Sequence, residues 1–275
     1  MKRRRRLEQV EQALQAANRK TDHRFVQDYL QIPHAPHAPW SPTWDDPSTG
    51  STYSLRLCQP RKTMASPDLD ACFALVRATS QADYEASSSG WDPSAKRDEM
   101  SHPDLRYILV KDPDSVVHAF TSLMPTIEEG QPVIYCYEIH LEPALRGTGL
   151  ARLLMGLLET VAHNMEVVHK VMLTVFTCNK RAVGFYQRCG FVRDGISPQP
   201  RTLRGGKVKM PEYEILSKRV ENRPATTTGG APPDGVPDEA ASRSGGKRKE
   251  RAGESALGPR KQAKIARLDC ATTGL

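Results

Sequence analysis

The 275-residue sequence has no uninterrupted apolar stretch of the length that crosses a membrane. Its first residues, Met1–Arg6, are as basic as the start of a secretory signal, but the polar stretch Leu7–Gln12 stands where such a signal needs an apolar core. We therefore expect a protein that stays inside the cell and has no membrane partner. Only 38% of the residues are hydrophobic, which is low for a fully compact chain of this size and predicts an unstructured part.

Paired cysteines are also missing, because no Cys-x-x-Cys motif occurs among the six cysteines of the chain. Most of them stand in or beside apolar runs, where free thiols usually pack. The two histidines of His34-Ala-Pro-His37 have no cysteine or acidic neighbour, so we interpret this segment as a solvated Pro-rich loop. The sequence predicts reduced thiols and no metal site.

Basic charge is unevenly distributed along the chain. The formal net charge of +7 divides into +5 for residues 1–20, +3 for residues 221–275 and −1 for the residues between them. The central part is nearly neutral, so the basic character does not by itself indicate a nucleic-acid-binding surface, which needs clustered cations on the folded domain. Direct nucleic-acid binding is not required by this distribution.

Three segments differ in composition. Residues 1–50 hold a basic stretch and a Pro- and His-containing connection, residues 51–220 have mixed α/β patterning, and residues 221–275 contain few large apolar residues. The central segment predicts the following elements in order: strands at 52–58, 105–110, 116–124 and 133–141, a helix at 149–163, a strand at 170–176, a helix at 180–188, and strands at 191–193 and 212–218, with one earlier helix at 67–84. This order predicts one α/β domain around a mixed sheet.

The two ends each allow two interpretations. Leu7, Val10, Leu14 and Ala17 recur at helical spacing and predict an amphipathic helix that docks on the central domain, with its arginine run either solvated or used for import or nucleic-acid contact. The final segment is predicted to be disordered. Its basic clusters Lys247–Lys249 and Arg260–Lys261 are compatible with a bipartite nuclear-import signal or with a solvated charged tail.

The strongest local motif is Arg146-Gly-Thr-Gly-Leu-Ala151, between an apolar strand and a helix. Leucines and Val161 follow at the spacing of a buried helical stripe. A Gly-rich turn in this setting presents backbone N–H groups and the positive end of a helix to a phosphate. A Walker loop and a dinucleotide-binding fingerprint are both excluded, because neither Gly-Lys-Ser/Thr nor G-x-G-x-x-G is present.

This motif and the later Asn179-x-x-Ala-x-x-Phe-Tyr186-x-x-x-Gly-Phe191 together resemble the GNAT acetyltransferases over roughly residues 50–220. The resemblance implies a GNAT (acyl-CoA N-acyltransferase) fold and acetyl-CoA as co-substrate. It assigns cofactor contacts to Ile139, His140, Leu141, Arg146, Gly147, Thr148, Gly149, Leu150, Ala151, Arg152 and Asn179, and places Tyr186 near the cofactor sulfur. Asn179 can equally be a helix N-cap, and Tyr186 can be a buried packing residue.

Three further stretches, Val133–Glu142, Lys170–Phe176 and Tyr213–Arg219, resemble the NatD N-terminal acetyltransferases, which act on histones that begin Ser-Gly-Arg-Gly. This resemblance implies an acceptor site lined by Tyr84, Trp91, Thr126, Glu128, Tyr137, Thr174 and Tyr213, with Glu138 beside the reacting amine. It also implies histone N-terminal tails as partners, and we expect a monomer in the nucleus and cytoplasm. Thr126 stands where that family usually has an aspartate, and Ser89-Gly90-Trp91 replaces a fuller aromatic pair.

The chemistry expected of this site needs one proton acceptor and one proton donor. Glu138 can take the proton of the amine, directly or through water, while Tyr137 or Tyr186 can protonate the departing thiolate. Regular strand alternation places Tyr137 and Glu138 on opposite faces, so their joint use requires a β-bulge. Cys136 and Cys178 flank the site, but no histidine that would activate either thiol can be recognised, so we expect direct transfer in a ternary complex.

Two other functions are compatible with the same sequence. A GNAT enzyme can act on lysine or on a small amine, and a GNAT fold can serve as a non-catalytic chromatin-binding scaffold. The acidic pair Glu128-Glu129 can likewise hold a substrate arginine or belong to a solvated hairpin loop.

The composition of the last segment generates a first prediction. Deleting residues 221–275 should leave the transfer rate unchanged and should shift the protein out of the nucleus, because the basic clusters lie in this segment and the expected site does not. Fluorescence microscopy of tagged full-length and shortened chains measures the nuclear fraction. Replacing only the five basic residues of the two clusters by glutamine is the control. An unaltered nuclear fraction contradicts the import interpretation.

Overall fold

The computed structural model describes residues 2–32, 37 and 39–221 of the chain. The segment predicted to be unstructured, residues 221–275, lies outside the described residues except for Glu221, and so does most of the loop around His34. The import signal and the proposed segment boundaries therefore stay predictions.

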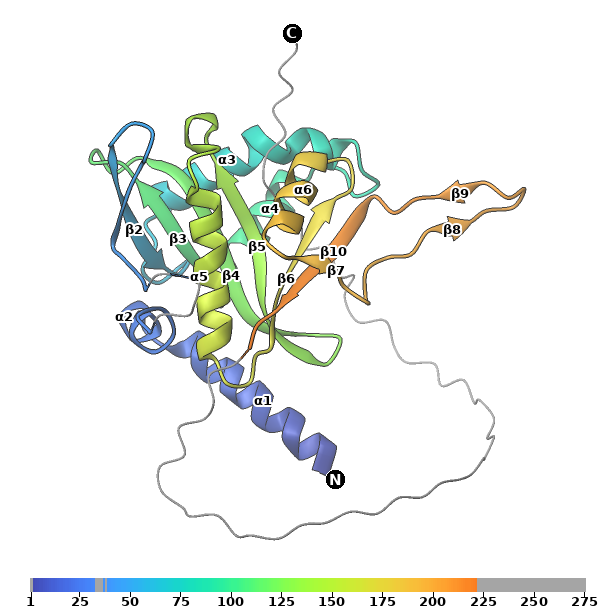
Figure 1. Ribbon diagram of the computed structural model, residues 1–275, viewed down its shortest axis with the longest axis horizontal. Coiled ribbons are helices and arrows are strands. Elements are labelled where there is room, and N and C mark those ends of the chain that lie inside the picture. The colour runs from blue at the N-terminus through green and yellow to red at the C-terminus, as the bar shows by residue number, and fades with distance from the viewer. Residues whose placement is uncertain (1, 33–36, 38, 222–275) are drawn as a thin grey trace. The chain divides into compact units, whose positions relative to one another are not determined.

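An eight-stranded mixed sheet is the centre of the described part of the chain (Figure 1). Its strand order is β1-β2-β3-β4-β5-β6-β10-β7, and of the pairs in the sheet only β5 with β6 is parallel. The strands are β1 (Thr43–Asp45), β2 (Thr52–Cys58), β3 (Arg106–Lys111), β4 (Val117–Glu128), β5 (Gln131–Leu141), β6 (Lys170–Phe176), β7 (Val192–Arg193) and β10 (Tyr213–Arg219). A separate hairpin of β8 (Arg201–Thr202) and β9 (Val208–Lys209) projects from the sheet (Figure 1).

Helices cover both faces of this sheet. One face packs against α1 (Lys2–Arg19), α5 (Leu150–Asn164) and α6 (Lys180–Arg188), and the other against α3 (Ser66–Glu85) and α4 (Pro93–Met100). Three short helical turns complete the helices: α2 (Asp22–Phe25), the π-helical turn η1 (Val26–Leu30) and the 3₁₀ turn η2 (Pro143–Leu145). The predicted α/β architecture, with its N-terminal helix and its mixed sheet, is confirmed.

Two hydrophobic cores result from this arrangement. The stripe of α5 predicted from the leucine spacing is buried against β5 and β6, with Leu150, Leu154 and Leu158 fully inaccessible to solvent. Cys72, Val76 and other residues of α3 fill the second core on the opposite face. Because β5 lies between the two cores, every residue from Val133 to Leu141 is buried, which explains why this stretch is apolar except for Glu138 and His140.

Several short elements escaped the sequence-based prediction. The most important is α4, which has only eight residues, most of them polar, and which buries only Lys96 and Met100, one turn apart. Its signals are local: the side chain of Asp92 caps the first turn, and Pro93 stands at the first helical position. A periodicity analysis needs a longer apolar stripe than such a helix offers.

The N-terminal helix is held to the sheet by a buried arginine of β3. Arg106 is fully inaccessible, and its guanidinium donates to the Asp22 carboxylate at 2.8 Å and to the carbonyls of Ala17 and Lys20. The same group lies over the ring of Phe25, 4.2 Å from the centroid. Burial lowers the pKa of Arg106 to about 10 although Asp22 opposes the shift, so the side chain stays charged at neutral pH.

Replacing this arginine should destabilise the fold. Arg106→Met should lower the free energy of unfolding by about 3 kcal/mol or more, because it leaves the partly buried Asp22 and several carbonyl groups without their cation. Arg56→Met, on the exposed face of β2, is the matched control and should change stability by less than about 0.5 kcal/mol. Urea unfolding followed by circular dichroism measures both. Equal effects of the two substitutions would show that Arg106 does not anchor the N-terminal helix to the sheet.

Candidate active site

The central strand β5 contains one extra residue relative to its partner β4. Ser122 of β4 lies opposite Glu138, but the next residue, Leu123, lies opposite Cys136, so Tyr137 is the bulged residue. A bulge reverses the alternation of side chains beyond it. Tyr137 and Glu138 consequently both point to the face covered by α3 and α4. Both side chains can therefore act in one reaction, which was expected from the sequence only if β5 contained a bulge.

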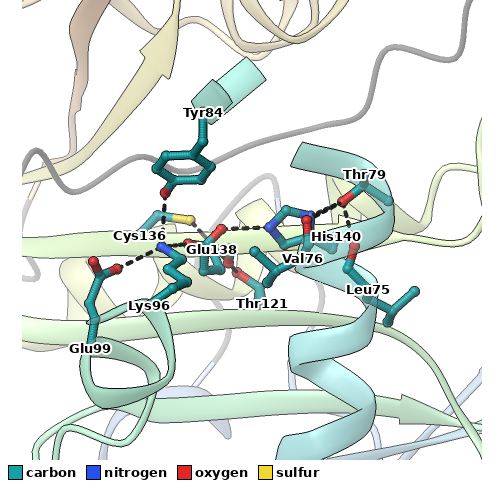
Figure 2. A network of polar contacts seen from close by, with 10 residues as sticks. All are labelled: Leu75, Val76, Thr79, Tyr84, Lys96, Glu99, Thr121, Cys136, Glu138 and His140. Carbon is teal, nitrogen blue, oxygen red and sulfur yellow. Dashed lines mark hydrogen bonds and ion pairs between the residues drawn. The ribbon is translucent and has the colours of Figure 1, made fainter. Parts of the chain in front are cut away.

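Glu138 is buried in the middle of a polar network that Figure 2 shows. One carboxylate oxygen forms an ion pair with the ammonium group of Lys96, and the other lies 2.5 Å from Nε2 of His140. Nδ1 of His140 lies 2.7 Å from the Thr79 hydroxyl of α3. Both oxygens of the carboxylate are therefore held by cationic or N–H groups.

These contacts set the charge of the carboxylate. Burial by itself raises the pKa of Glu138, but Lys96 and then His140 outweigh it, and the pKa lies below its ordinary value. Burial likewise lowers the pKa of Lys96, but Glu138, Tyr84 and Glu99 raise it well above its ordinary value. The pair is ionised at neutral pH, so Glu138 is a fixed negative charge and a weak base.

Aromatic side chains surround the same end of the sheet. The ring centroid of Tyr84 lies 5.4 Å from that of Trp91 and 5.3 Å from that of Phe176. Tyr213, opposite Phe176 in the ladder of β6 and β10, packs against this group. Glu212 accepts hydrogen bonds from the backbone N–H and the hydroxyl of Ser88, which ties the loop that carries Trp91 to the start of β10.

The expected acceptor residues of β4 and β6 lie on this face too. Thr126 is paired with Val133 of the α3-side core, and Glu128 lies two residues further along the same face of β4. Thr174 is buried, with its hydroxyl 2.5 Å from that of Tyr135. Burial, and after it the charge of Glu128, raise the pKa of Tyr137, so its phenol is a proton donor at neutral pH. The structure thus brings the expected acceptor residues to one face.

The Gly-rich turn lies between β5 and α5, where the sequence places it. Gly147 has φ of +82° and Gly149 has φ of +94°, a region that favours glycine. The N-cap residue of α5, Gly149, makes no side-chain hydrogen bond to the first turn, and a Cβ atom built on either glycine meets nothing within 4 Å. The hydroxyl of Thr148 donates to the Leu145 carbonyl and accepts from the Leu150 N–H. The turn is an open cradle of N–H groups at the positive end of a helix.

The strands β5 and β6 are paired over only part of their length. Their parallel ladder joins Ile134–Cys136 to Val171–Leu173 and ends at the bulge. Beyond it β5 continues through Ile139, His140 and Leu141 toward the Gly-rich turn. An extended ligand arm can run along this stretch from the cradle to Tyr137, which fits the cofactor path that the sequence resemblance implies.

Two expected cofactor residues lie on the α5 side of the sheet. The carboxamide oxygen of Asn179 accepts the N–H of Ala182 at 3.0 Å, so this residue is the N-cap of α6. Tyr186 is fully buried against Phe185 and Phe191. The structural alternatives raised from the sequence, a helix N-cap for Asn179 and buried packing for Tyr186, are therefore both present. The cofactor roles of these two residues, like those of Arg146, Ala151 and Arg152, stay predictions.

The cysteine beside the site is not an activated nucleophile. Burial raises the pKa of Cys136 to about 12, with Glu138 adding to the shift, so the thiolate is scarce at neutral pH. Within residues 2–32, 37 and 39–221, no three His, Cys, Asp or Glu side chains are grouped as metal ligands. None of the helices in this part of the chain combines the length and hydropathy that a membrane crossing needs.

Sequence reasoning missed Lys96 and Thr79, and it assigned His140 only a backbone role. Lys96 belongs to the short helix that was not predicted, and nothing in its sequence neighbourhood marks a buried lysine. The one available signal was spacing, since Lys96 precedes the apolar Met100 by four residues.

Comparisons with known proteins agree with this geometry. Residues 73–191 match the model of the family described as acetyltransferase (GNAT) family. The chain is 34% identical to N-alpha-acetyltransferase 40 of Saccharomyces cerevisiae, in an alignment that covers 62% of this chain and 70% of that protein. It is 29% identical to spermidine N(1)-acetyltransferase of Vibrio cholerae over 32% of this chain and 50% of that protein.

Solved structures with low sequence identity also match. The ribosomal-protein-S18-alanine N-acetyltransferase of Escherichia coli aligns with a TM-score of 0.43 and 14% identity, over 64% of this chain and 99% of that chain. Arabidopsis thaliana NAA60 in complex with a bisubstrate analogue aligns with a TM-score of 0.43 and 11% identity, over 62% of this chain and 100% of that chain.

The open cradle generates a prediction on ligand binding. Gly149→Trp should abolish acetyl-CoA binding, because the indole fills the space through which a pyrophosphate reaches the backbone N–H groups. Gly205→Trp is the matched control: Gly205 has φ of +88°, equally open surroundings and a place in the distant β8–β9 turn. Calorimetry with both folded variants measures the affinity. Unchanged binding by Gly149→Trp contradicts the cradle.

Proposed function

The chain belongs to the GNAT acetyltransferase family, and we propose that it transfers acetyl from acetyl-CoA to the free N-terminal amine of histones that begin Ser-Gly-Arg-Gly. Membership of the NatD group of this family is part of the proposal. The name of the yeast relative, the similarity of three strands to that group and the arrangement of the site support it. The observation that carries the proposal is the ionised Glu138 on the same face as Tyr84, Tyr137 and Tyr213.

The proposed acceptor suits a site whose carboxylate is a weak base. An N-terminal amine has a pKa of about 7.7–8.0, against about 10.4 for lysine, so a sizeable fraction of it is already neutral near pH 7.4. The enzyme therefore has no need to deprotonate a strongly basic ammonium group before attack. The pKa of a lysine acceptor is about 2.5 units higher, so its deprotonation would cost ~3.4 kcal/mol more.

Each group of the chain then has a defined task. Acetyl-CoA supplies an acetyl thioester when it is bound. The turn Arg146–Arg152 holds its pyrophosphate, and the stretch Ile139–Leu141 aligns its arm. Glu138 stabilises the positive charge that develops on the amine nitrogen during attack and accepts its proton through water, and Tyr137 donates a proton to the leaving sulfur.

The substrate arginine at the third position would be held by Glu128. This residue lies at the outer end of β4, on the face of the site, and its charge reaches the phenols of Tyr135 and Tyr137. A carboxylate and a guanidinium form charge-assisted, often bidentate, hydrogen bonds. Thr126, two residues away on the same face, can accept a further N–H of the peptide. Trp91 and Thr174 are assigned to the same acceptor site.

A small amine is the second candidate acceptor. Similarity to the spermidine N(1)-acetyltransferase of Vibrio cholerae favours it, over a shorter segment of both chains. A polyamine would bind the same carboxylates, Glu128 and Glu138, through its ammonium groups. We place the protein in the nucleus and cytoplasm, as a monomer, in agreement with either acceptor.

Acceptor peptides separate these functions. Ser-Gly-Arg-Gly peptides should be acetylated only at the α-amine, and blocking that amine should leave the peptide's lysines unmodified. Replacing the arginine by alanine should lower kcat/KM roughly ten- to a hundred-fold. This factor corresponds to a loss of about 1.5–3 kcal/mol in transition-state stabilisation, the range of a hydrogen bond to a charged group. Mass spectrometry locates the acetyl group. Transfer to the blocked peptide would indicate a lysine enzyme, and transfer only to spermidine a polyamine enzyme.

A substitution in the protein completes this test. Glu128→Gln should cost a similar amount with the natural peptide and little with the alanine peptide, because the arginine partner is already gone. Glu129→Gln, one residue further in the turn, is the matched control and should have little effect on either peptide. Acetyl-CoA binding without transfer to any acceptor would favour a non-catalytic scaffold.

A further inference from the structure

Lys96 is a buried cation that the proposed chemistry does not yet use. Its side chain is 4% exposed and comes from α4, the short helix under the aromatic end of the sheet. The ammonium group is surrounded by three oxygen acceptors from three elements: Tyr84 of α3 at 3.0 Å, Glu99 of α4 at 2.8 Å, and Glu138 of β5 (Figure 2). An ammonium group has three N–H donors, so all of them are used.

We propose that Lys96 is a positioning residue for acetyl transfer, which holds the carboxylate of Glu138 and the hydroxyl of Tyr84 together at the acceptor amine. The inference rests on the proposed function, because Glu138 and Tyr84 are assigned there to the acceptor site. Lys96 itself contacts neither substrate. It acts through the two side chains that it binds.

The geometry excludes an interpretation as a simple surface ion pair. A surface pair is worth little, because water screens it and its side chains are mobile. Lys96 and Glu138 are both nearly inaccessible, and each carboxylate oxygen of Glu138 has its own partner, Lys96 for one and His140 for the other, which fixes the orientation of the group. Removing one member of such a buried pair leaves an uncompensated charge in a site of low dielectric.

The charged and titratable groups that face Glu138 come from four elements. Lys96 and Glu99 lie on α4, Tyr84 on α3 and His140 on β5, and Tyr107 of β3 is close enough that the Glu138 charge raises its pKa. Of these groups Lys96 lowers the pKa of Glu138 most. Without Lys96, burial favours the protonated carboxyl group and only His140 opposes it, so the pKa of Glu138 should rise.

The pH dependence of kcat/KM tests this directly. In the wild-type enzyme Glu138 is ionised over the working range, so the acidic limb reports one proton, that of the peptide amine, with a slope of about one on a logarithmic plot. In Lys96→Met the carboxyl group must also lose a proton, and the limb should steepen toward a slope of about two. At neutral pH kcat/KM should fall about ten- to a hundred-fold.

A matched control is available in a second, partly buried ion pair on the same side of the sheet. Lys111 of β3 donates to Asp68 of α3 at 2.6 Å, with side chains 12% and 11% exposed. Lys111→Met should reduce thermal stability but leave the slope of the acidic limb unchanged. Lys96→Arg keeps the charge with another shape, so its limb should keep the wild-type slope while kcat falls. Lys96→Arg also tests the positioning role if Lys96→Met does not fold.

A double variant distinguishes action through Glu138 from a general structural defect. Lys96→Met combined with Glu138→Gln should be little slower than Glu138→Gln alone, because the partner through which Lys96 acts is already gone. Additive losses would overturn the proposal. So would a Lys96→Met enzyme with the wild-type slope, because the ionisation of Glu138 would then not depend on Lys96.

A measurement without turnover separates this inference from the proposed function. Carbon-13 NMR of glutamate side-chain carboxyl groups, with Glu138 assigned from Glu138→Gln, should show its titration at a higher pH in Lys96→Met than in the wild type. If the wild type acetylates no free N-terminus, the proposed acceptor is wrong, and this titration still decides the role of Lys96. If Glu138 titrates at the same pH in both proteins, the inference that Lys96 keeps Glu138 ionised is wrong.

Discussion

A single extra residue in β5 is the constraint on which the rest of the site depends. Because Tyr137 is an extra residue, the alternation of side chains between the two faces of the sheet is reversed beyond it. The phenol of Tyr137 and the carboxylate of Glu138, which are neighbours in sequence, therefore point to the same face. The same position ends the ladder with β6. One local irregularity thus brings a phenol and a carboxylate together. It also ends the pairing of β5 with β6, so that an extended ligand arm has room along β5.

The bulge places a carboxylate where water cannot solvate it, and the surrounding elements supply the compensation. Lys96 comes from α4 and His140 from the strand itself, while Thr79 of α3 holds the far side of the imidazole. A buried ion pair contributes little net stability compared with apolar packing, but it defines one charge state and one orientation. For an acceptor amine that is already partly neutral, a fixed negative charge is more useful than a strong base.

The same principle of a buried cation recurs at the N-terminal corner. Arg106 joins β3 to the end of α1 and to α2, in contact with Asp22, three backbone carbonyls and the ring of Phe25. Amphipathic burial alone would fix α1 weakly, because only Leu14 and Ala17 of its apolar positions are fully buried. The charged anchor gives this helix a definite place against β4 and β3.

The amino-acid sequence by itself determined the order of the long elements, the stripe of α5 and the Gly-rich turn, because these depend on periodicity and on local backbone preferences. Resemblance to known families added the residues of the acceptor face. Only the tertiary structure decided that Tyr137 and Glu138 share a face, since a bulge depends on the register with a neighbouring strand. It also decided that Lys96 meets Glu138 and that Asn179 caps a helix, because the charge and contacts of a buried side chain depend on elements far apart in the sequence.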